Sequence, residues 1–139
     1  KQVPGSVGYV ELIYAVGNKM PYAHIKNKSG IFIEPSIKSV SLAAGIALPD
    51  DTRASITDTA AQEGYPISGF TWLLLYKEQK YGGRTKERAE NLLKLMWWIV
   101  HEGQQLAEAL DYAPLPKDAV QKAESILRSC LYGGEKILQ

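Results

Sequence analysis

The stretch EGYPISGFTWLLLYKE, residues 63–78, decides the fold of this chain because the sequence changes there from loop to strand. Gly64 and Pro66 interrupt regular structure. The run that follows them is apolar without polar alternation, which is typical of a strand covered on both faces in a sheet between helices. We therefore predict a buried central strand over residues 71–77 and a crossover between two structural units at Tyr65.

Upstream of this stretch the sequence carries mainly strand and turn signals. Alternating β-branched and aromatic residues favour strands, and the string Asn-Lys-Ser-Gly at residues 27–30 is suited to a hairpin turn. One segment instead has apolar residues at helical spacing behind Pro35. The predicted elements are a strand over residues 7–15, a hairpin of residues 22–26 and 31–34, a helix over residues 36–48, and a loop over residues 49–62 with a short strand at 55–58.

Downstream of the central strand the sequence is helical. Thr85 can cap a helix whose apolar residues form one stripe, and Pro116 suits the first turn of a last helix. The predicted elements are a helix over residues 85–101, short turns over 104–110, and a helix over 116–131 that ends at Gly133 and Gly134. Together these segments predict an α/β fold in which helices flank a sheet.

Composition excludes several classes of protein. The 139 residues suffice for one domain, and the formal charge of +1 provides no field that would favour nucleic acid or an anionic membrane. No apolar run is long enough to span a bilayer, and the first residues lack the apolar core of a signal peptide. The sequence begins with Lys1 rather than an initiator Met, so we expect a processed chain or a fragment. Cys130 is the sole cysteine, which excludes an internal disulfide and a cysteine metal cluster.

Catalytic chemistry has weak support in the sequence. A triad of Ser68, His101 and Asp58 can be imagined, but Ser68 does not lie in a G-x-S-x-G elbow. A cationic His101 would simply complement the end of its helix, and His24 has no second metal ligand near it in the sequence. We therefore expect no enzyme activity, no catalytic residue, no metal and no cofactor.

Two further groups of residues are candidates for ligand sites. Ser68, Gly69 and Thr71 offer hydroxyl and backbone N–H groups that can hold an oxyanion, which makes them weak candidates for a cleft site. A turn that delivers Thr71 into the sheet is the simpler interpretation, since Walker and Rossmann spacings are absent. Trp97 and Trp98 are better explained by packing than by stacking on a sugar or base.

The order of three strings carries a resemblance to a known family. PGSVGYVE at residues 4–11 is followed by YPIS and TWLLLYK at 65–68 and 71–77, and then by LDYAPLP at 110–116. In this order they resemble the C-terminal half of bacterial phosphate-binding proteins, the extracytoplasmic receptors of the phosphate ABC transporter. The resemblance covers essentially the whole chain.

The resemblance implies a part of a two-lobed α/β receptor of the periplasmic-binding-protein type (type II), with a mixed sheet and flanking helices, that closes on inorganic phosphate between its lobes. Residues 1–64 would then form the C-terminal part of lobe II, and residues 65–139 would return into lobe I. The family's phosphate-binding strings do not occur here, and Arg53 and Arg84 lie outside any such string. No phosphate ligand is therefore carried over to this chain.

The expected partners follow from the same resemblance. They are inorganic phosphate through the full-length protein, the membrane permease of the transporter, and the missing N-terminal half or a second copy of the chain; no nucleic acid is expected. The expected location is the periplasm or the extracytoplasmic cell surface. An alternative is a stand-alone binding or assembly domain that kept the scaffold and lost the ligand site.

Overall fold

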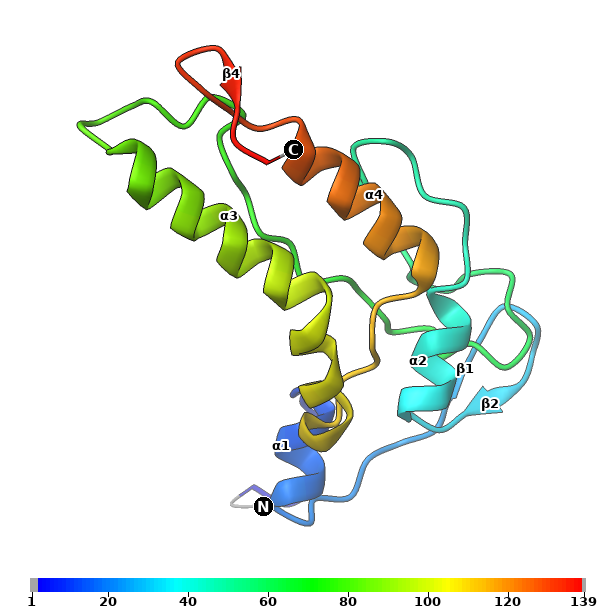
Figure 1. Cartoon of the computed structure of the whole chain (residues 1–139). Coiled ribbons are helices and arrows are strands. Elements are labelled where there is room, and N and C mark those ends of the chain that lie inside the picture. Colours follow the sequence, from blue (N-terminus) through cyan, green and yellow to red (C-terminus); the bar gives the residue numbers. More distant parts are fainter. Residues whose placement is uncertain (1–2, 139) are drawn as a thin grey trace.

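The structure is a computed structural model that describes residues 3–138, and it contains helices and short strands (Figure 1). The strands form two separate antiparallel ribbons, β1 with β2 and β3 with β4. In chain order the elements are α1 (Leu12–Gly17), β1 (Ile25–Lys26), β2 (Phe32–Ile33), α2 (Ile37–Ala43), α3 (Lys86–Val100), the 3₁₀-helices η1 (Glu102–Leu106) and η2 (Glu108–Leu110), α4 (Lys117–Arg128), β3 (Leu131–Tyr132) and β4 (Glu135–Lys136). The chain is thus a mixed helix and strand structure, and none of its described helices is long and apolar enough to cross a membrane.

The prediction of a strand over residues 7–15 is wrong. The helix α1 begins at Leu12, and residues 7–10 before it are exposed and irregular. Leu12 and Ala15 are spaced for one helical face, and Ala15 is buried. The short helical face therefore determined the local structure more strongly than the alternation of β-branched and aromatic residues. The helix ends at Gly17, and the side chain of the next residue, Asn18, donates to the Tyr14 carbonyl at 2.9 Å.

The predicted hairpin at residues 22–34 is confirmed, with shorter strands. Ile25 pairs with Ile33 and Lys26 with Phe32 in antiparallel register. The side-chain oxygen of Asn27 accepts hydrogen bonds from the N–H groups of the following turn, and Gly30 has a φ of +83°, a conformation that favours glycine.

The helix α2 confirms the first predicted helix over part of its length. Ser36 caps it, because its Oγ accepts from the Ser39 N–H at 3.1 Å while Ser39 Oγ accepts from the Ser36 N–H at 3.0 Å. The predicted strand at residues 55–58 is wrong: this segment is irregular, although Ile56 is buried. The backbone of this segment bonds to the turn near Ser68 instead of to a strand, since the Asp58 N–H donates to the Pro66 carbonyl at 2.9 Å.

The two long helices agree with the prediction over most of their lengths, and the main apolar core lies between them. α3 is capped by Thr85 Oγ1, and α4 begins directly after Pro116. They lie side by side in opposite directions (Figure 1). The core between them contains Leu93, Leu127 and Cys130, and the partly buried side chains packed against it are those of Leu75, Met96, Trp97, Val100, Ile137 and Leu138.

The end of the chain differs from the prediction. Helix α4 ends at Arg128, and Gly133 and Gly134 form the turn of the β3–β4 ribbon rather than the end of the helix. Both glycines have positive φ, at +63° and +87°. The carboxylate of Glu78 accepts hydrogen bonds from the N–H groups of Gly133 at 2.8 Å, Gly134 at 3.1 Å and Lys80 at 2.8 Å. These bonds lower the pKa of Glu78, and the bond from Lys80 contributes most.

The predicted central strand is the largest error. Residues 71–76 have no strand partner among the described residues, and a single parallel bridge joins Glu78 to Leu131. Leu74 is 94% exposed, so the predicted burial on both faces is contradicted. Leu75 alone of this run packs against the core of α3 and α4. A continuous mixed sheet is therefore not formed by residues 3–138.

Candidate functional site

The corner that contains Ser68 is a structural turn in this chain. Ser68 is only 7% exposed, and its Oγ donates to the Tyr65 carbonyl at 2.8 Å. Its own carbonyl accepts from Thr57 Oγ1 at 3.3 Å. Gly69 and Thr71 follow on the surface. The Ser68 hydroxyl is thus used to hold the crossover, while Thr71 is accessible.

The three residues of the imagined triad have separate partners. Ser68 bonds to Tyr65, Asp58 Oδ1 accepts the Lys28 N–H at 2.8 Å, and His101 Nε2 lies 2.8 Å from Glu124 Oε1. None of these three bonds joins two members of the triad. The arrangement gives no serine nucleophile with an adjacent base.

His101 belongs instead to a contact between α3 and α4. Its ring stacks on Trp97 with centroids 4.5 Å apart, and its Nδ1 lies 2.8 Å from the Trp97 carbonyl oxygen. The guanidinium of Arg128 lies 4.8 Å above the Trp97 ring. The hydrogen bonds to the Trp97 carbonyl and then to Glu124 raise the pKa of His101. Trp97 is therefore a packing residue, as predicted.

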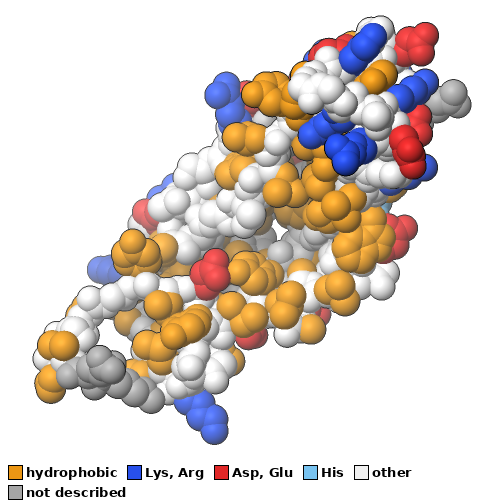
Figure 2. All heavy atoms as spheres, turned by 90° about the vertical axis from the view of Figure 1, so that its left-hand side faces the viewer, with side chains coloured by type: hydrophobic (Ala, Val, Ile, Leu, Met, Phe, Trp, Pro, Cys, Tyr) orange, Lys and Arg blue, Asp and Glu red, His pale blue; other side chains and the backbone are white. Residues whose placement is uncertain are grey.

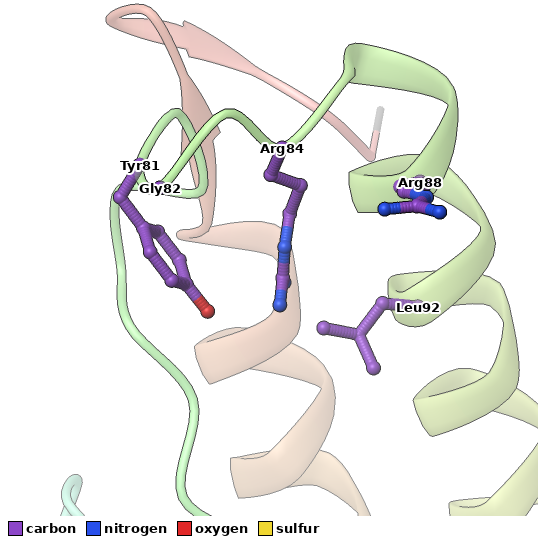
Figure 3. Close-up of a pocket in the computed structure, with 5 residues that line it drawn as sticks. All are labelled: Tyr81, Gly82, Arg84, Arg88 and Leu92. Carbon is purple, nitrogen blue, oxygen red and sulfur yellow. The ribbon is translucent and has the colours of Figure 1, made fainter.

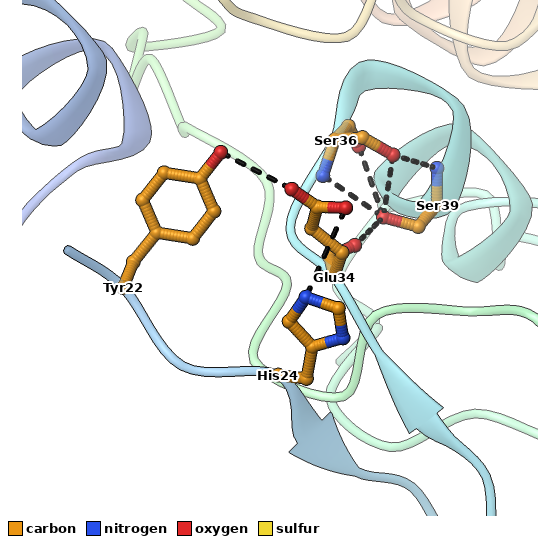
Figure 4. A network of polar contacts seen from close by, with 5 residues as sticks. All are labelled: Tyr22, His24, Glu34, Ser36 and Ser39. Carbon is orange, nitrogen blue, oxygen red and sulfur yellow. Dashed lines mark hydrogen bonds and ion pairs between the residues drawn. The ribbon is translucent and has the colours of Figure 1, made fainter.

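A second polar cluster lies beside the first hairpin (Figure 4). Tyr22 Oη donates to Glu34 Oε1 at 3.2 Å, which raises the pKa of Tyr22, and His24 Nε2 lies 3.9 Å from Glu34 Oε2. The neighbouring Ser36 and Ser39 form the cap of α2. Within residues 3–138 no group of three His, Cys, Asp or Glu side chains is placed to hold a metal ion. This cluster connects the hairpin to α2.

A pocket of about 380 Å³ lies at the start of α3 (Figure 3). Its wall is held by Arg84, whose Nη1 donates to Gln79 Oε1 at 2.5 Å and whose guanidinium lies 4.7 Å from the Tyr81 ring centroid. Arg88 faces the same hollow from α3. The lining residues are Tyr81, Gly82, Arg84, Arg88 and Leu92. Its two guanidinium groups favour an anion over a cation, although the pocket is open to solvent. The pocket could not be predicted from the sequence, because its residues come together only after the glycine turn folds back on α3.

The extended segment 71–76 is the most unusual surface of the chain. Among the described residues, no backbone N–H or C=O group of residues 70–75 makes a hydrogen bond. Trp72, Leu74 and Tyr76 are exposed, and Figure 2 shows hydrophobic side chains spread broadly over one face of the molecule. Apolar side chains beside unpaired backbone groups are a surface for another strand rather than for a small molecule.

Comparison with known proteins identifies related sequences, although no family model matches the chain. It is 34% identical to the phosphate-binding protein PstS of Xylella fastidiosa over 128 residues. The aligned region covers 90% of this chain and 34% of that protein. The identity to the phosphate-binding protein PstS of Haemophilus influenzae is 31% over 128 residues, or 90% of this chain and 37% of the relative. The identity to the phosphate-binding protein PstS of Methanocaldococcus jannaschii is 30% over 131 residues, or 87% of this chain and 34% of that protein.

The three relatives come from different organisms, and their identity to this chain lies between 30% and 34%. The chain spans about a third of the length of the curated relatives that it matches. The three strings that carried the resemblance lie between residues 4 and 116, so they extend over most of the chain. The predicted resemblance is therefore confirmed: over about nine tenths of its length, this chain is similar to a segment of the phosphate-binding proteins.

Proposed function

We propose that this chain is part of a solute-binding receptor that captures inorganic phosphate outside the cytoplasm for uptake by an ABC transporter. The observation that carries the proposal is the similarity of nine tenths of the chain to proteins named phosphate-binding protein. The role is one of binding and delivery to a membrane permease, without catalysis. The periplasm or the outer cell surface is the corresponding location.

The proposed receptor has two lobes with an α/β fold of the periplasmic-binding-protein type. Residues 1–64 would belong to lobe II and residues 65–139 to lobe I, with the crossover at Tyr65. Support comes from the hydrogen bonds that hold the crossover in place, such as Tyr65 N–H to the Ser39 carbonyl at 3.0 Å. A defined corner at this point suits a chain that passes from one lobe to the other.

We infer that phosphate is held mainly by groups outside this chain. A buried dianion needs several strong donors. At the crossover, Ser68 already donates to Tyr65, and Gly69 and Thr71 remain as weak cleft candidates. The chain by itself should therefore bind phosphate in the millimolar range or more weakly, which corresponds to about 4 kcal/mol or less.

Calorimetry tests this proposal. Phosphate is titrated into the 139-residue chain and into the longer native protein that contains it, with sulfate as the control anion. We expect tight, phosphate-selective binding by the longer protein and weak heat from the chain alone. Failure of the longer protein to bind phosphate would refute the receptor function and favour the alternative, a stand-alone binding or assembly domain. Micromolar binding by the chain would place the site within it.

A further inference from the structure

We infer that residues 71–76 form an acceptor for a β-strand supplied by the remainder of the receptor. The identity of this partner depends on the proposed function, but the acceptor itself is argued from the described residues. The segment is apolar and largely exposed, its backbone makes no hydrogen bond to a described residue from Thr71 to Leu75, and it begins three residues after the buried corner at Ser68.

The chain is already paired just after this segment. The Leu131 N–H donates to the Lys77 carbonyl at 2.8 Å, and the Gln79 N–H donates to the Leu131 carbonyl at 2.7 Å. These two bonds make Leu131 a parallel partner of Glu78. Among the described residues, this bridge is the one strand pairing of residues 71–79, and β3 otherwise pairs with β4.

The backbone of residues 71–76 is open before this pairing begins. The chain bends at Lys77, and none of residues 71–76 has a strand partner among the described residues. The Tyr76 carbonyl accepts from Gln79 Nε2, whereas the N–H and C=O groups of Trp72 and Leu74 have no hydrogen bond to any described residue. Unpaired groups in a row are a template for another strand.

The side chains distinguish a central strand from a natural edge. Natural edge strands are protected by charged residues or proline, and residues 70–76 contain neither. Leu75 packs against the α3–α4 core, while the adjacent Leu74 is 94% exposed. A sequence that is apolar on both faces is expected to be covered on both.

The size of the relatives indicates which partner covers this segment. They are about three times as long as the part that this chain matches, so much of the receptor lies outside residues 1–139. We therefore expect the open backbone of residues 71–76 to pair with a strand of that remaining part rather than with a second copy. Addition of one strand would pair the backbone of Trp72 and Leu74, and apolar side chains of the same part would cover Leu74.

The experiment uses the native protein, whose intact mass is measured first. A mass of only 15.4 kDa, that of this chain, would overturn the proposed receptor function and with it the partner. A longer protein is then compared with the 139-residue chain by amide hydrogen exchange. We expect residues 71–76 to exchange at least about a thousandfold more slowly in the longer protein. Equal, rapid exchange in both proteins would overturn this inference and leave the receptor function intact.

A pair of leucine variants gives a second readout. Leu74→Asp should sharply lower the thermal midpoint or soluble yield of the longer protein and leave the 139-residue chain unchanged, because Leu74 is already exposed there. Leu106→Asp, at another exposed leucine, is the matched control and should be tolerated in both. Equal tolerance of Leu74→Asp in both proteins would contradict the inference. A stable dimer of the 139-residue chain with slow exchange at residues 71–76 would show that a second copy is the partner.

Discussion

Asn27 shows how one buried polar side chain can hold a distant loop in place. Its Nδ2 donates to the Gln62 carbonyl at 2.7 Å and to the Gly64 carbonyl at 3.3 Å, while its Oδ1 accepts from the N–H groups of Ser29 and Ile31. Asn27→Ala removes all four bonds and leaves buried polar groups without partners. We expect a loss of about 1–3 kcal/mol in the free energy of unfolding, measured by urea denaturation.

The control for this change is the neighbouring residue. Lys28 is exposed, and the hydrogen bond to Asp58 comes from its backbone N–H, which a side-chain change preserves. Lys28→Ala should therefore be nearly neutral. A loss as large as that of Asn27→Ala would mean that the charge of Lys28, rather than the amide of Asn27, stabilises the hairpin.

His101 makes the contact between α3 and α4 sensitive to pH. Its pKa is raised in the folded chain above the ordinary value of 6.5, so the contribution of the protonated ring is complete below about pH 6.5 and is lost as the pH rises through the higher folded pKa. Urea denaturation should thus give lower stability above that pKa than at about pH 6. His101→Gln should reduce this dependence, and an unchanged pH profile in the variant would assign it to another group.

At the scale of elements, the pair α3 and α4 depends on Leu93. This side chain has no exposed surface and lies between the two helices with Leu127 and Cys130. Leu93→Ala should cost about 2–5 kcal/mol by urea denaturation, because it leaves a cavity in the core. Leu95→Ala on the same helix is the control, since Leu95 is 50% exposed, and its cost should be much smaller. Equal costs would mean that α3 packs through a different face.

The elements that could be predicted from sequence are those whose determinants are local. Thr85 and Pro116 mark the starts of α3 and α4, and the turn at Asn27 to Gly30 marks the first hairpin. The short elements were mistaken where two local patterns compete, as at Leu12 to Gly17. The end of α4 was misplaced because glycines suit both a helix end and a tight ribbon turn.

At the scale of the whole molecule, the error at residues 71–76 has a different origin. The apolar sequence Trp72 to Leu75 indicates burial, but burial needs partners on every side, and this chain supplies only the α3–α4 core beneath Leu75. An apolar sequence indicates that a segment is buried in the complete protein. The residues that bury it can belong to a part of the protein outside this chain. The pocket of Arg84 and Arg88 escaped prediction because the glycine turn that brings them together carries no charge pattern.

Cys130 is a buried thiol whose chemical labelling can report opening of the α3–α4 core. Its thiol lies buried between α3 and α4, and burial raises its pKa, so the reactive thiolate forms in solvent only when the helices separate. The rate at which an alkylating reagent labels this single sulfur therefore measures how often the helix pair opens. Leu75 packs against the same core and belongs to the segment that lacks a strand partner. Slower labelling of Cys130 in the longer protein would therefore indicate that this segment is paired there.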